Sequence, residues 1–417
     1  MAVKDSFQAL RRRPPIPLIV FLLAAAGVAA VVIFVNGSGK RPTPLPQASG
    51  SGSSGPLSHR SFLERVIPAP PERTTGPAVP RSLADLARRL PLERKAAQLF
   101  LFGFTGTGAR GPVFRDLARV DLGGLVIRAD NDAGKRQLAR LTAAAARVAR
   151  KHRHVPPWLL TIQDGGAFSE LLNLPPRDPP SRIGSVRAAG AEAADAAAAL
   201  RKLGINGVLG PDVDVDTSPG GAYTKLSFSD LPGQVARFAV VTVRAYAREK
   251  MLTTPKHFPG LGAASQPTDD GPANVGLSTG QLGRRDLLPF KAAFRAGAEG
   301  VMLGHGLYST DEFVTPASQS AAIATNLLRN ALRFRGIAVT DDLESPAIKG
   351  TQSVADAAVA AVKAGADMVY ISGPHADESA AYLAVLNAAR SHEIPAARID
   401  QAVLRILRTK RRLGLIG

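Results

Sequence analysis

The segment GVMLGH at residues 300–305 is a short apolar run that ends on a histidine, and it sets the pattern of the chain. Eight such runs recur, namely LFLFGF (99–104), GLVIR (124–128), WLLTI (158–162), GVLGPDV (207–213), LTTPKHF (252–258), GVMLGH (300–305), GIAVT (336–340) and DMVYIS (367–372). Ala-rich amphipathic stretches separate them, which is typical of βαβ units in a parallel sheet. The count of eight favours a (β/α)8 TIM barrel over residues 81–417. An open doubly wound sheet is the alternative, but the chain lacks its glycine-rich phosphate turn.

The N-terminal part of the chain has a different character. Residues 18–35 read LIVFLLAAAGVAAVVIFV and contain no charge over 18 positions, enough for a helix to cross the core of a bilayer. A cleaved signal peptide is the alternative, but its apolar part usually spans about 7 to 15 residues. We therefore expect one transmembrane anchor over residues 16–36, preceded by a basic tail over residues 1–15.

The charges around this apolar run predict its orientation. Lys4, Arg11, Arg12 and Arg13 precede it, whereas fewer basic residues follow closely, so the N-terminus is expected in the cytoplasm. Residues 37–80 are rich in Gly, Ser and Pro and are predicted to form a linker. The barrel is then expected outside the membrane, on a single-pass anchor.

The overall charge limits the classes of partner. The formal net charge is +18; residues 1–81 contribute +7, from ten Lys/Arg against three Asp/Glu, and the remainder contributes +11. Such a chain favours anionic surfaces such as acidic lipid, and it shows no nucleic-acid-binding motif. The absence of cysteine excludes a thiolate nucleophile and cysteine-ligated zinc.

Polar residues gather where the predicted strands end. These residues are Asp164, Asp214, Lys256, His257, His305, Asp341, Asp342 and His375. Because the carboxyl ends of barrel strands meet at one rim, we expect these side chains to form one polar ligand site. An aspartate after a strand can instead cap the following helix, and that alternative applies more strongly to Asp342 than to Asp341.

Two further segments are specific. KHFPGLGAASQPTD at residues 256–269 and VTDDLES at residues 339–345 resemble glycoside hydrolase family 3, above all its single-barrel β-N-acetylhexosaminidases. The likeness runs in the right order from PLERKAAQLFLFGFTG (91–106) to RIDQAVLRILRTKRRLGL (398–415). The resemblance implies a retaining glycosidase that uses no metal or cofactor.

The same resemblance implies roles for single residues. Asp341 corresponds to the nucleophile that forms the covalent glycosyl-enzyme intermediate. Lys256 and His257 correspond to the pair that binds sugar hydroxyls, and His305 corresponds to a residue of the site wall. Asp164 is expected to contact substrate from the end of its strand.

The chain departs from the family pattern at the proton donor. The family's acid/base histidine ends a TDTH-like pattern that here reads Thr268, Asp269, Asp270 and Gly271. Asp269 or Asp270 is therefore our first candidate for the general acid. His375 reaching across the rim, or a donor from another protein, stays open.

Sugar-binding positions have changed as well. Ile162, Ala167 and Leu226 stand where the family has an Asp and two Arg, and Lys225 is expected to replace the arginine at Leu226. We therefore predict a membrane-anchored, retaining β-N-acetylhexosaminidase that acts on N-acetylhexosamine-containing glycans outside the membrane. The alternative is a degenerate barrel that binds a glycan or a protein partner without hydrolysis.

Overall fold

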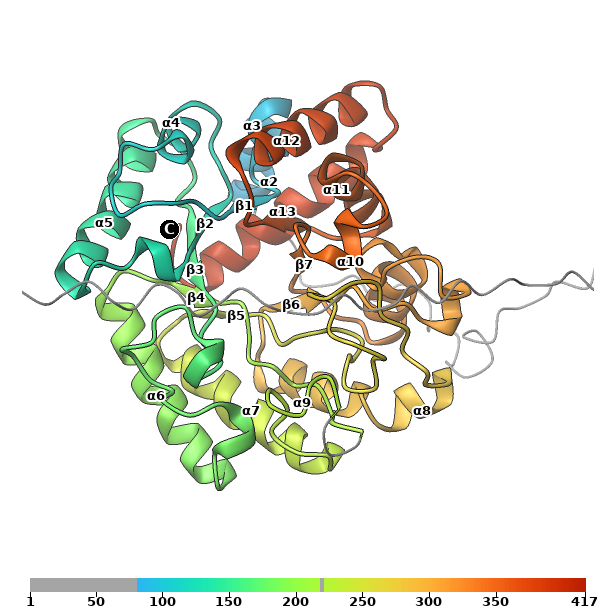
Figure 1. The fold of residues 1–417 in the computed structure, drawn as a ribbon. Helices are drawn as coiled ribbons and strands as arrows, with labels where there is room; N and C mark the ends of the chain where they lie inside the picture. Colours follow the sequence, from blue (N-terminus) through green and yellow to red (C-terminus); the bar gives the residue numbers. More distant parts are fainter. Residues whose placement is uncertain (1–80, 218–220) are drawn as a thin grey trace, which may run out of the picture. The chain divides into compact units, whose positions relative to one another are not determined.

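The computed structural model describes residues 81–217 and 221–417, which contain eight parallel strands (Figure 1). The strands are β1 Phe100–Phe102, β2 Gly124–Ile127, β3 Trp158–Thr161, β4 Gly207–Val208, β5 Leu252–Thr253, β6 Gly300–Leu303, β7 Ile337–Asp342 and β8 Met368–Ile371. Each strand lies in one of the eight predicted runs, except that β7 extends two residues further. The two added residues are Asp341 and Asp342.

The strands close into a barrel. Their order is β5-β4-β3-β2-β1-β8-β7-β6, and every paired neighbour is parallel. Just past β5, the backbone N–H of Met302 donates to the carbonyl of Pro255 at 3.0 Å, and that of Phe258 donates to Met302 at 2.7 Å. These bonds connect the β5 side to β6, so the predicted (β/α)8 barrel is confirmed.

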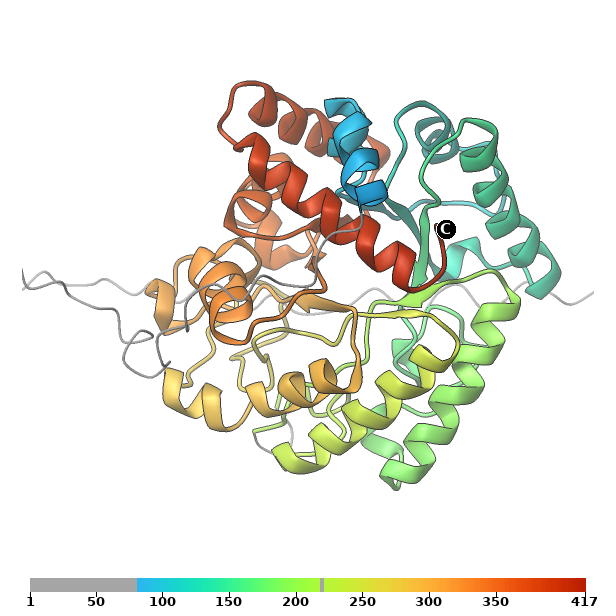
Figure 2. The ribbon, with the colours of Figure 1, turned by 180° about the vertical axis from the view of Figure 1, so that it is seen from behind.

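Helices surround the barrel and return the chain from one strand to the next (Figures 1 and 2). They are α2 Arg81–Arg89, α3 Leu92–Ala97, α4 Pro112–Arg119, α5 Lys135–Lys151, α6 Val186–Lys202, α7 Pro232–Arg248, α8 Thr279–Arg284, α9 Leu287–Ala296, the π-helix η6 Ala322–Ala331, α10 Pro346–Lys349, α11 Val354–Ala364, α12 His375–Arg390 and α13 Ala396–Arg412. Figure 2 shows α13 running across the back of the barrel with α2 against it.

Local sequence explains where several helices begin and end. The hydroxyl of Ser185 accepts a hydrogen bond from the N–H of Ala188 at the start of α6, and Ser353 caps α11 in the same way. Pro232 occupies the first turn of α7, where its missing N–H costs nothing. Gly297 ends α9 with a φ of 102°, which glycine adopts without strain.

The core fills the barrel and the space beneath the helices. Every residue of β1, β2, β3, β6 and β8 is buried, which explains their continuous apolar runs. Trp158 and Phe100 are among the largest fully buried side chains. A rigid core of this kind holds the strand ends, and with them the polar rim, in fixed positions.

The predicted membrane-associated parts precede the described residues. The tail over residues 1–15, the anchor over residues 16–36 and the linker over residues 37–80 lie outside the described residues. Within residues 81–217 and 221–417, no helix has the length and apolar character needed to span a bilayer.

Candidate active site

A cavity of about 440 Å³ opens at the carboxyl ends of the strands. Its wall includes Asp164 after β3, Lys256 and His257 after β5, and Asp341 at the end of β7. With Asp342, which also lines it, five of the predicted strand-end residues therefore share one cavity. Its volume falls in the range of about 300–1,000 Å³ that is usual for small-molecule sites.

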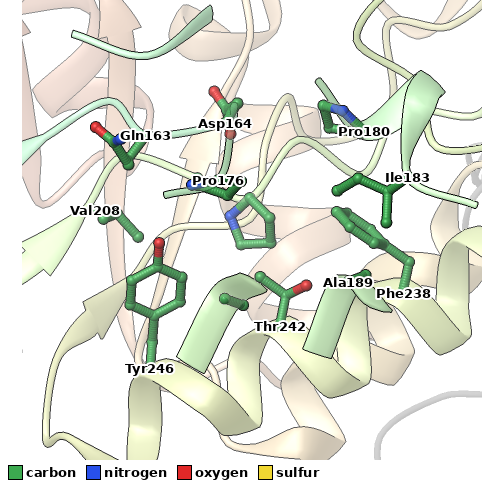
Figure 3. A pocket seen from close by; sticks show the side chains of 13 residues that line it. Gln163, Asp164, Pro176, Pro180, Ile183, Ala189, Val208, Phe238, Thr242 and Tyr246 are labelled. Carbon is green, nitrogen blue, oxygen red and sulfur yellow. The ribbon is translucent and has the colours of Figure 1, made fainter. Parts of the chain in front are cut away.

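A second, smaller cavity lies behind Asp164, beside α7 (Figure 3). Its volume is about 20 Å³, and Thr242 and Tyr246 of α7 reach its wall. Neither hydroxyl has a hydrogen-bond partner among the described residues. This space fits about one water molecule and no sugar, so the larger cavity is the candidate active site.

Lys256 is held as a cation on the wall of the larger cavity. Its Nζ lies 2.5 Å from Oδ2 of Asp164, and both side chains are almost fully buried. The other oxygen of Asp164 accepts a hydrogen bond of 3.2 Å from the backbone N–H of Asp212. Burial opposes the charge of Lys256, but the carboxylates of Asp164 and Asp212 outweigh it and raise its pKa. Lys256 is thus a positively charged side chain held in a fixed position at the cavity wall.

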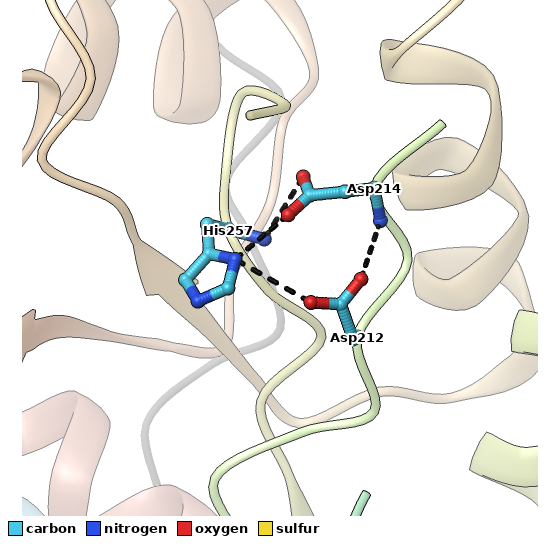
Figure 4. A group of neighbouring side chains, drawn as sticks. All are labelled: Asp212, Asp214 and His257. Carbon is cyan, nitrogen blue, oxygen red and sulfur yellow. Dashed lines mark hydrogen bonds and ion pairs between the residues drawn. The ribbon is translucent and has the colours of Figure 1, made fainter. Parts of the chain in front are cut away.

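His257 is oriented by a buried carboxylate (Figure 4). Its Nδ1 donates to Oδ2 of Asp214 at 2.7 Å, and Oδ1 of Asp214 accepts from the backbone N–H of Leu261, also at 2.7 Å. Burial lowers the pKa of His257, but Asp214, then Asp341 and Asp212, raise it to about 9. His257 is therefore protonated at neutral pH. Its other nitrogen, Nε2, lies 3.7 Å from Oδ2 of Asp341.

Asp212, Asp214 and His257 also form a group of described residues that could hold a metal ion, because one ligand atom from each lies within 4.8 Å of the others. However, the proton on Nδ1 of His257 is already shared with Asp214. A metal ion would have to displace that proton. We interpret this group as the hydrogen-bonded support of His257.

Asp341 and Asp342 are neighbours with different surroundings. Among the described residues, Oδ1 of Asp341 accepts one hydrogen bond, from the N–H of Asp342 at 2.9 Å, and the Asp341 side chain is 19% exposed. Burial raises the pKa of Asp341, but the charges of His257 and His305 outweigh that effect and lower it. Asp342 instead accepts backbone N–H groups of Glu344 at 3.1 Å and Ser372 at 3.0 Å. Both residues line the cavity, but burial raises the pKa of Asp342 to about 6, and its oxygens hold the turn, whereas Asp341 is the more readily ionised carboxylate.

The loop after β5 brings Asp269 to the wall of the same cavity. The carbonyl of the preceding residue, Thr268, accepts the hydroxyl of Ser345 at 2.6 Å and the N–H of Ala347 at 3.1 Å. Asp269 is exposed and lines the cavity, and desolvation followed by the charge of Asp341 raises its pKa. Asp270 is exposed and does not line the cavity. Of the two candidate acids, Asp269 is the one that shares a cavity with Asp341.

A family model described as the glycosyl hydrolase family 3 N-terminal domain matches residues 91–409. The chain belongs to glycoside hydrolase family 3. A β-hexosaminidase of Xylella fastidiosa is 30% identical over 287 residues, which is 66% of this chain and 84% of that protein. This family 3 chain is therefore a glycoside hydrolase that resembles β-hexosaminidases.

Solved structures of family 3 proteins share the fold. A β-N-acetylglucosaminidase from a Paenibacillus species superimposes with a TM-score of 0.75 at 32% identity, over 79% of this chain and 64% of that one. A β-N-acetylhexosaminidase from Beutenbergia cavernae gives a TM-score of 0.71 at 28% identity, over 77% of this chain and 99% of that one. The barrel alone therefore accounts for nearly the whole of the Beutenbergia chain.

Two histidines of the family 3 barrel lie outside the cavity wall. The ring of His305 contacts the hydroxyl of Ser318 and the carbonyl of Asp342, each at 2.9 Å, so both of its nitrogens are occupied. His375 begins α12 and lies 3.4 Å from a carboxylate oxygen of Asp116. His305 thus supports the site from behind, and His375 is held away from it.

The substituted sugar-binding positions of the family pattern do face the cavity. Ile162, Ala167 and Leu226 all contribute to its wall. Lys225, the expected replacement for the lost arginine, is exposed and does not contribute to it. This part of the wall is therefore less polar than the family pattern leads one to expect.

Several cavity residues are absent from the sequence-based prediction, among them Tyr223, Arg128 and Ser372. The ring of Tyr223 lies 5.8 Å from that of His257, and its hydroxyl accepts the N–H of Thr268 at 3.3 Å. Arg128 and Ser372 also line the cavity, and Arg128 donates to the carbonyl of Ser372 at 2.8 Å. Arg128 ends the GLVIR run, so the strand-end rule could have found it. No sequence signal marked Tyr223.

Proposed function

We propose that this glycoside hydrolase is a retaining β-N-acetylhexosaminidase, anchored to a membrane and acting on glycans outside it. The observation that carries the proposal is the position of Asp341, an ionised carboxylate on the wall of a sugar-sized cavity. The protonated ring of His257 lies 3.7 Å away and favours its charged form. The names of its relatives support an N-acetylhexosamine as the sugar.

The proposed reaction has two steps. An oxygen of Asp341 attacks the anomeric carbon while the glycosidic bond breaks and the leaving oxygen takes up a proton, which gives a glycosyl ester. Water then attacks the same carbon, loses a proton and releases Asp341. Lys256 and His257 donate hydrogen bonds to hydroxyl groups of the sugar and hold it above Asp341.

We further propose Asp269 as the group that supplies and later removes the proton. It lies on the cavity wall, and its raised pKa favours the protonated carboxyl that an acid catalyst needs. Ser345 and Ala347 donate hydrogen bonds to the carbonyl of Thr268, and we call this pair of bonds the clamp on Thr268. The clamp joins the loop that carries Asp269 to the turn that follows Asp341. Asp270, one residue further, serves as the matched comparison because it does not line the cavity.

The membrane part of the proposal is based on sequence alone. The uncharged run at residues 18–35 and the basic residues before it support a single-pass anchor with the barrel outside. The test is extraction of membranes carrying the full chain. The chain should stay with the membrane in high salt, and a soluble product that begins near residue 36 would overturn the anchor.

The deciding experiment for the activity is hydrolysis of an aryl β-N-acetylglucosaminide, followed by proton NMR of the first-formed sugar. Retention requires the β-anomer to appear before mutarotation. The α-anomer appearing first would refute the double-displacement mechanism. Asp341→Asn should abolish the reaction, since a carboxamide cannot form the ester.

A second candidate is a barrel that binds glycan without cleaving it. The apolar wall formed by Ile162, Ala167 and Leu226 favours it, because these side chains cannot bind a polyol through charged hydrogen bonds. Calorimetric titration with a chitin oligosaccharide separates the two candidates. Binding without any turnover of the aryl substrate would favour this second function.

A further inference from the structure

The face of the barrel opposite the active site is marked by basic helix ends. In a (β/α)8 barrel the helices run antiparallel to the strands, so their C-terminal ends lie at the amino ends of the strands. The barrel helices are α4, α5, α6, α7, α9, η6, α11 and α12, and each carries a Lys or Arg in its last turn. Four of these cations are paired with carboxylates, namely Arg119, Arg329, Lys363 and Arg390, so the unpaired positive charge is concentrated at the ends of α5, α6, α7 and α9.

Stabilisation of the helices does not account for this pattern. The helix dipole favours cations in the last turn and anions in the first turn equally. Among these eight helices, only α11 and α12 have an acidic residue in the first turn. Pairing of cations and anions with the helix dipole therefore does not explain the basic last turns, although exposed cations such as Lys135 and Arg187 also occur at the opposite helix ends.

Three neighbouring helices carry the densest part of this charge. The last turns of α5, α6 and α7 and the residues just after them expose Arg150, Lys151, Arg201, Lys202, Arg248 and Lys250. None of the six forms an ion pair with a described residue. One acidic residue, the half-buried Glu249, lies among them. We call these six residues the basic face.

The described chain starts at the same end of the barrel. Lys410 of α13 donates to the carbonyl of Gly123, just before β2, at 3.1 Å, and it lies over the ring of Trp158, the first residue of β3. The next residue, Arg411, donates to the hydroxyl of Ser82 in α2 at 3.1 Å. Helix α13 therefore crosses the amino ends of the strands and carries the beginning of α2 with it.

We infer that the basic face docks on the anionic headgroups of the membrane in which the chain is anchored. This inference rests on the anchor in the proposed function. The 45 residues at positions 36–80 could span up to about 150 Å when fully extended, so an anchor alone does not keep the barrel near the lipid. Attraction between the basic face and acidic lipid acts within about 10 Å and supplies that contact.

Docking by this face has a functional consequence. The active-site cavity opens at the carboxyl ends of the strands, opposite the basic face. A docked barrel therefore turns its cavity away from the bilayer and toward glycans beyond it. A barrel that tumbled on its tether would present the cavity in all directions.

The test uses the full chain in vesicles of phosphatidylcholine, with or without about one third phosphatidylglycerol. Because the chain has no cysteine, single labels can be placed by Ala247→Cys beside Arg248 and by Ala133→Cys before α5, both at exposed positions. Energy transfer from each label to acceptor lipid reports its distance from the bilayer. We expect phosphatidylglycerol to raise transfer at least twofold from position 247 but not from position 133. About 0.5 M salt should reverse the rise.

Charge variants provide the matched comparison. Changing Arg150, Lys151, Arg201 and Lys202 to Gln should remove the rise at position 247. The control variant removes four exposed basic residues near the opposite ends of the helices, by changing Lys135, Arg136, Arg182 and Arg187 to Gln. It should leave the phosphatidylglycerol-dependent increase in energy transfer in place. Circular dichroism checks that both variants are folded.

The possible outcomes separate docking by the basic face from anchoring of the chain in the bilayer. Flotation with both kinds of vesicle but equal transfer from the two labels overturns docking and leaves the anchor standing. Flotation that is sensitive to salt and occurs with phosphatidylglycerol vesicles alone supports docking and overturns the anchor. Flotation with neither kind of vesicle overturns both docking and the anchor. As a last comparison, soluble polyphosphate is added at a total charge equal to that of the lipid. If it abolishes the phosphatidylglycerol-dependent increase in energy transfer from position 247, the basic face binds a soluble polyanion, and docking on lipid is overturned.

Discussion

The two sides of the active-site cavity are built in different ways. On one side, Asp341 and His257 stand at strand ends, and buried Asp214 fixes the imidazole at 2.7 Å. On the other side, Asp269 is exposed on a long loop and is positioned through its neighbour Thr268. The first side has its charges paired before any sugar binds. The second side carries Asp269, our proposed proton donor, on an exposed part of the loop. The comparison predicts that substitutions on the two sides have different effects on catalysis.

The largest effect is expected at the strand-end side. Asp341→Asn should lower kcat by at least about 10³-fold on every substrate, since the nucleophile is lost. Asp342→Asn is the comparison; it replaces a carboxylate that accepts the N–H groups of Glu344 and Ser372, and should lower the melting temperature more than kcat. Kinetics and thermal melts of both variants test this, and the reverse order would place the nucleophile at Asp342.

A smaller and substrate-dependent effect is expected on the loop side. Asp269→Asn should slow hydrolysis of a natural disaccharide by about 10²- to 10⁴-fold, because its leaving group needs full protonation. An aryl glycoside with a good leaving group should lose much less in the first step. Asp270→Asn should change neither rate more than about twofold. Equal losses on both substrates for Asp269→Asn would rule it out as the acid.

The two sides should also titrate separately. Hydrolysis of the aryl glycoside should fall as the pH rises through about 9, where His257 loses its proton. Hydrolysis of the natural disaccharide should fall at a lower pH, because the carboxyl of Asp269 must still be protonated. A pH profile of kcat/KM for each substrate tests this. Coincident alkaline limbs would show that one group controls both.

The same histidine links pH to stability. Folding raises the pKa of His257 from 6.5 to about 9. Its contribution to the free energy of unfolding is therefore fully present below pH 6.5 and is lost as the pH rises to about 9. Urea unfolding at several pH values should show this loss in the parent. The variant His257→Gln should show a flatter profile over the same range.

The smallest effect concerns the missing histidine of the family pattern. Sequence alone suggests Gly271→His as a repair, but Gly271 has a φ of 152°, and a Cβ there would meet the side-chain nitrogen of Gln266 at 3.2 Å. The loop must move before a histidine can enter the cavity. We therefore expect less than about a tenfold gain on the natural disaccharide. A larger gain would show that the loop rearranges easily.

Strand-end residues were predictable because strands follow local sequence. The eight apolar runs predict all eight strands, and the rule that barrel sites lie at carboxyl ends then brings Asp164, Lys256, His257 and Asp341 together. Whether a given strand-end side chain reaches the cavity depends on how it packs against the rest of the barrel. His305 stands at the same rim, yet Ser318 and the carbonyl of Asp342 occupy its ring.

Loop residues were predicted less well for a physical reason. A loop has no repeat that tells which side chains face inward, so Lys225 was chosen although its neighbour Leu226 faces the cavity. Tyr223 contacts Thr268 across 45 positions of sequence, and no local pattern encodes such a pairing. The structure was needed to separate Asp269 from Asp270.

The clamp on Thr268 has a consequence for how this barrel can diversify. Ser345 and Ala347, which hold its carbonyl, belong to the segment that directly follows Asp341 and Asp342. Asp269 is therefore kept in register with Asp341 through these two hydrogen bonds to the neighbouring residue. Leu261 is buried, and its N–H holds Asp214, so the first part of the loop is fixed as well. Changes in length are instead best accommodated around exposed Ser265, where they leave Asp269 in register with Asp341.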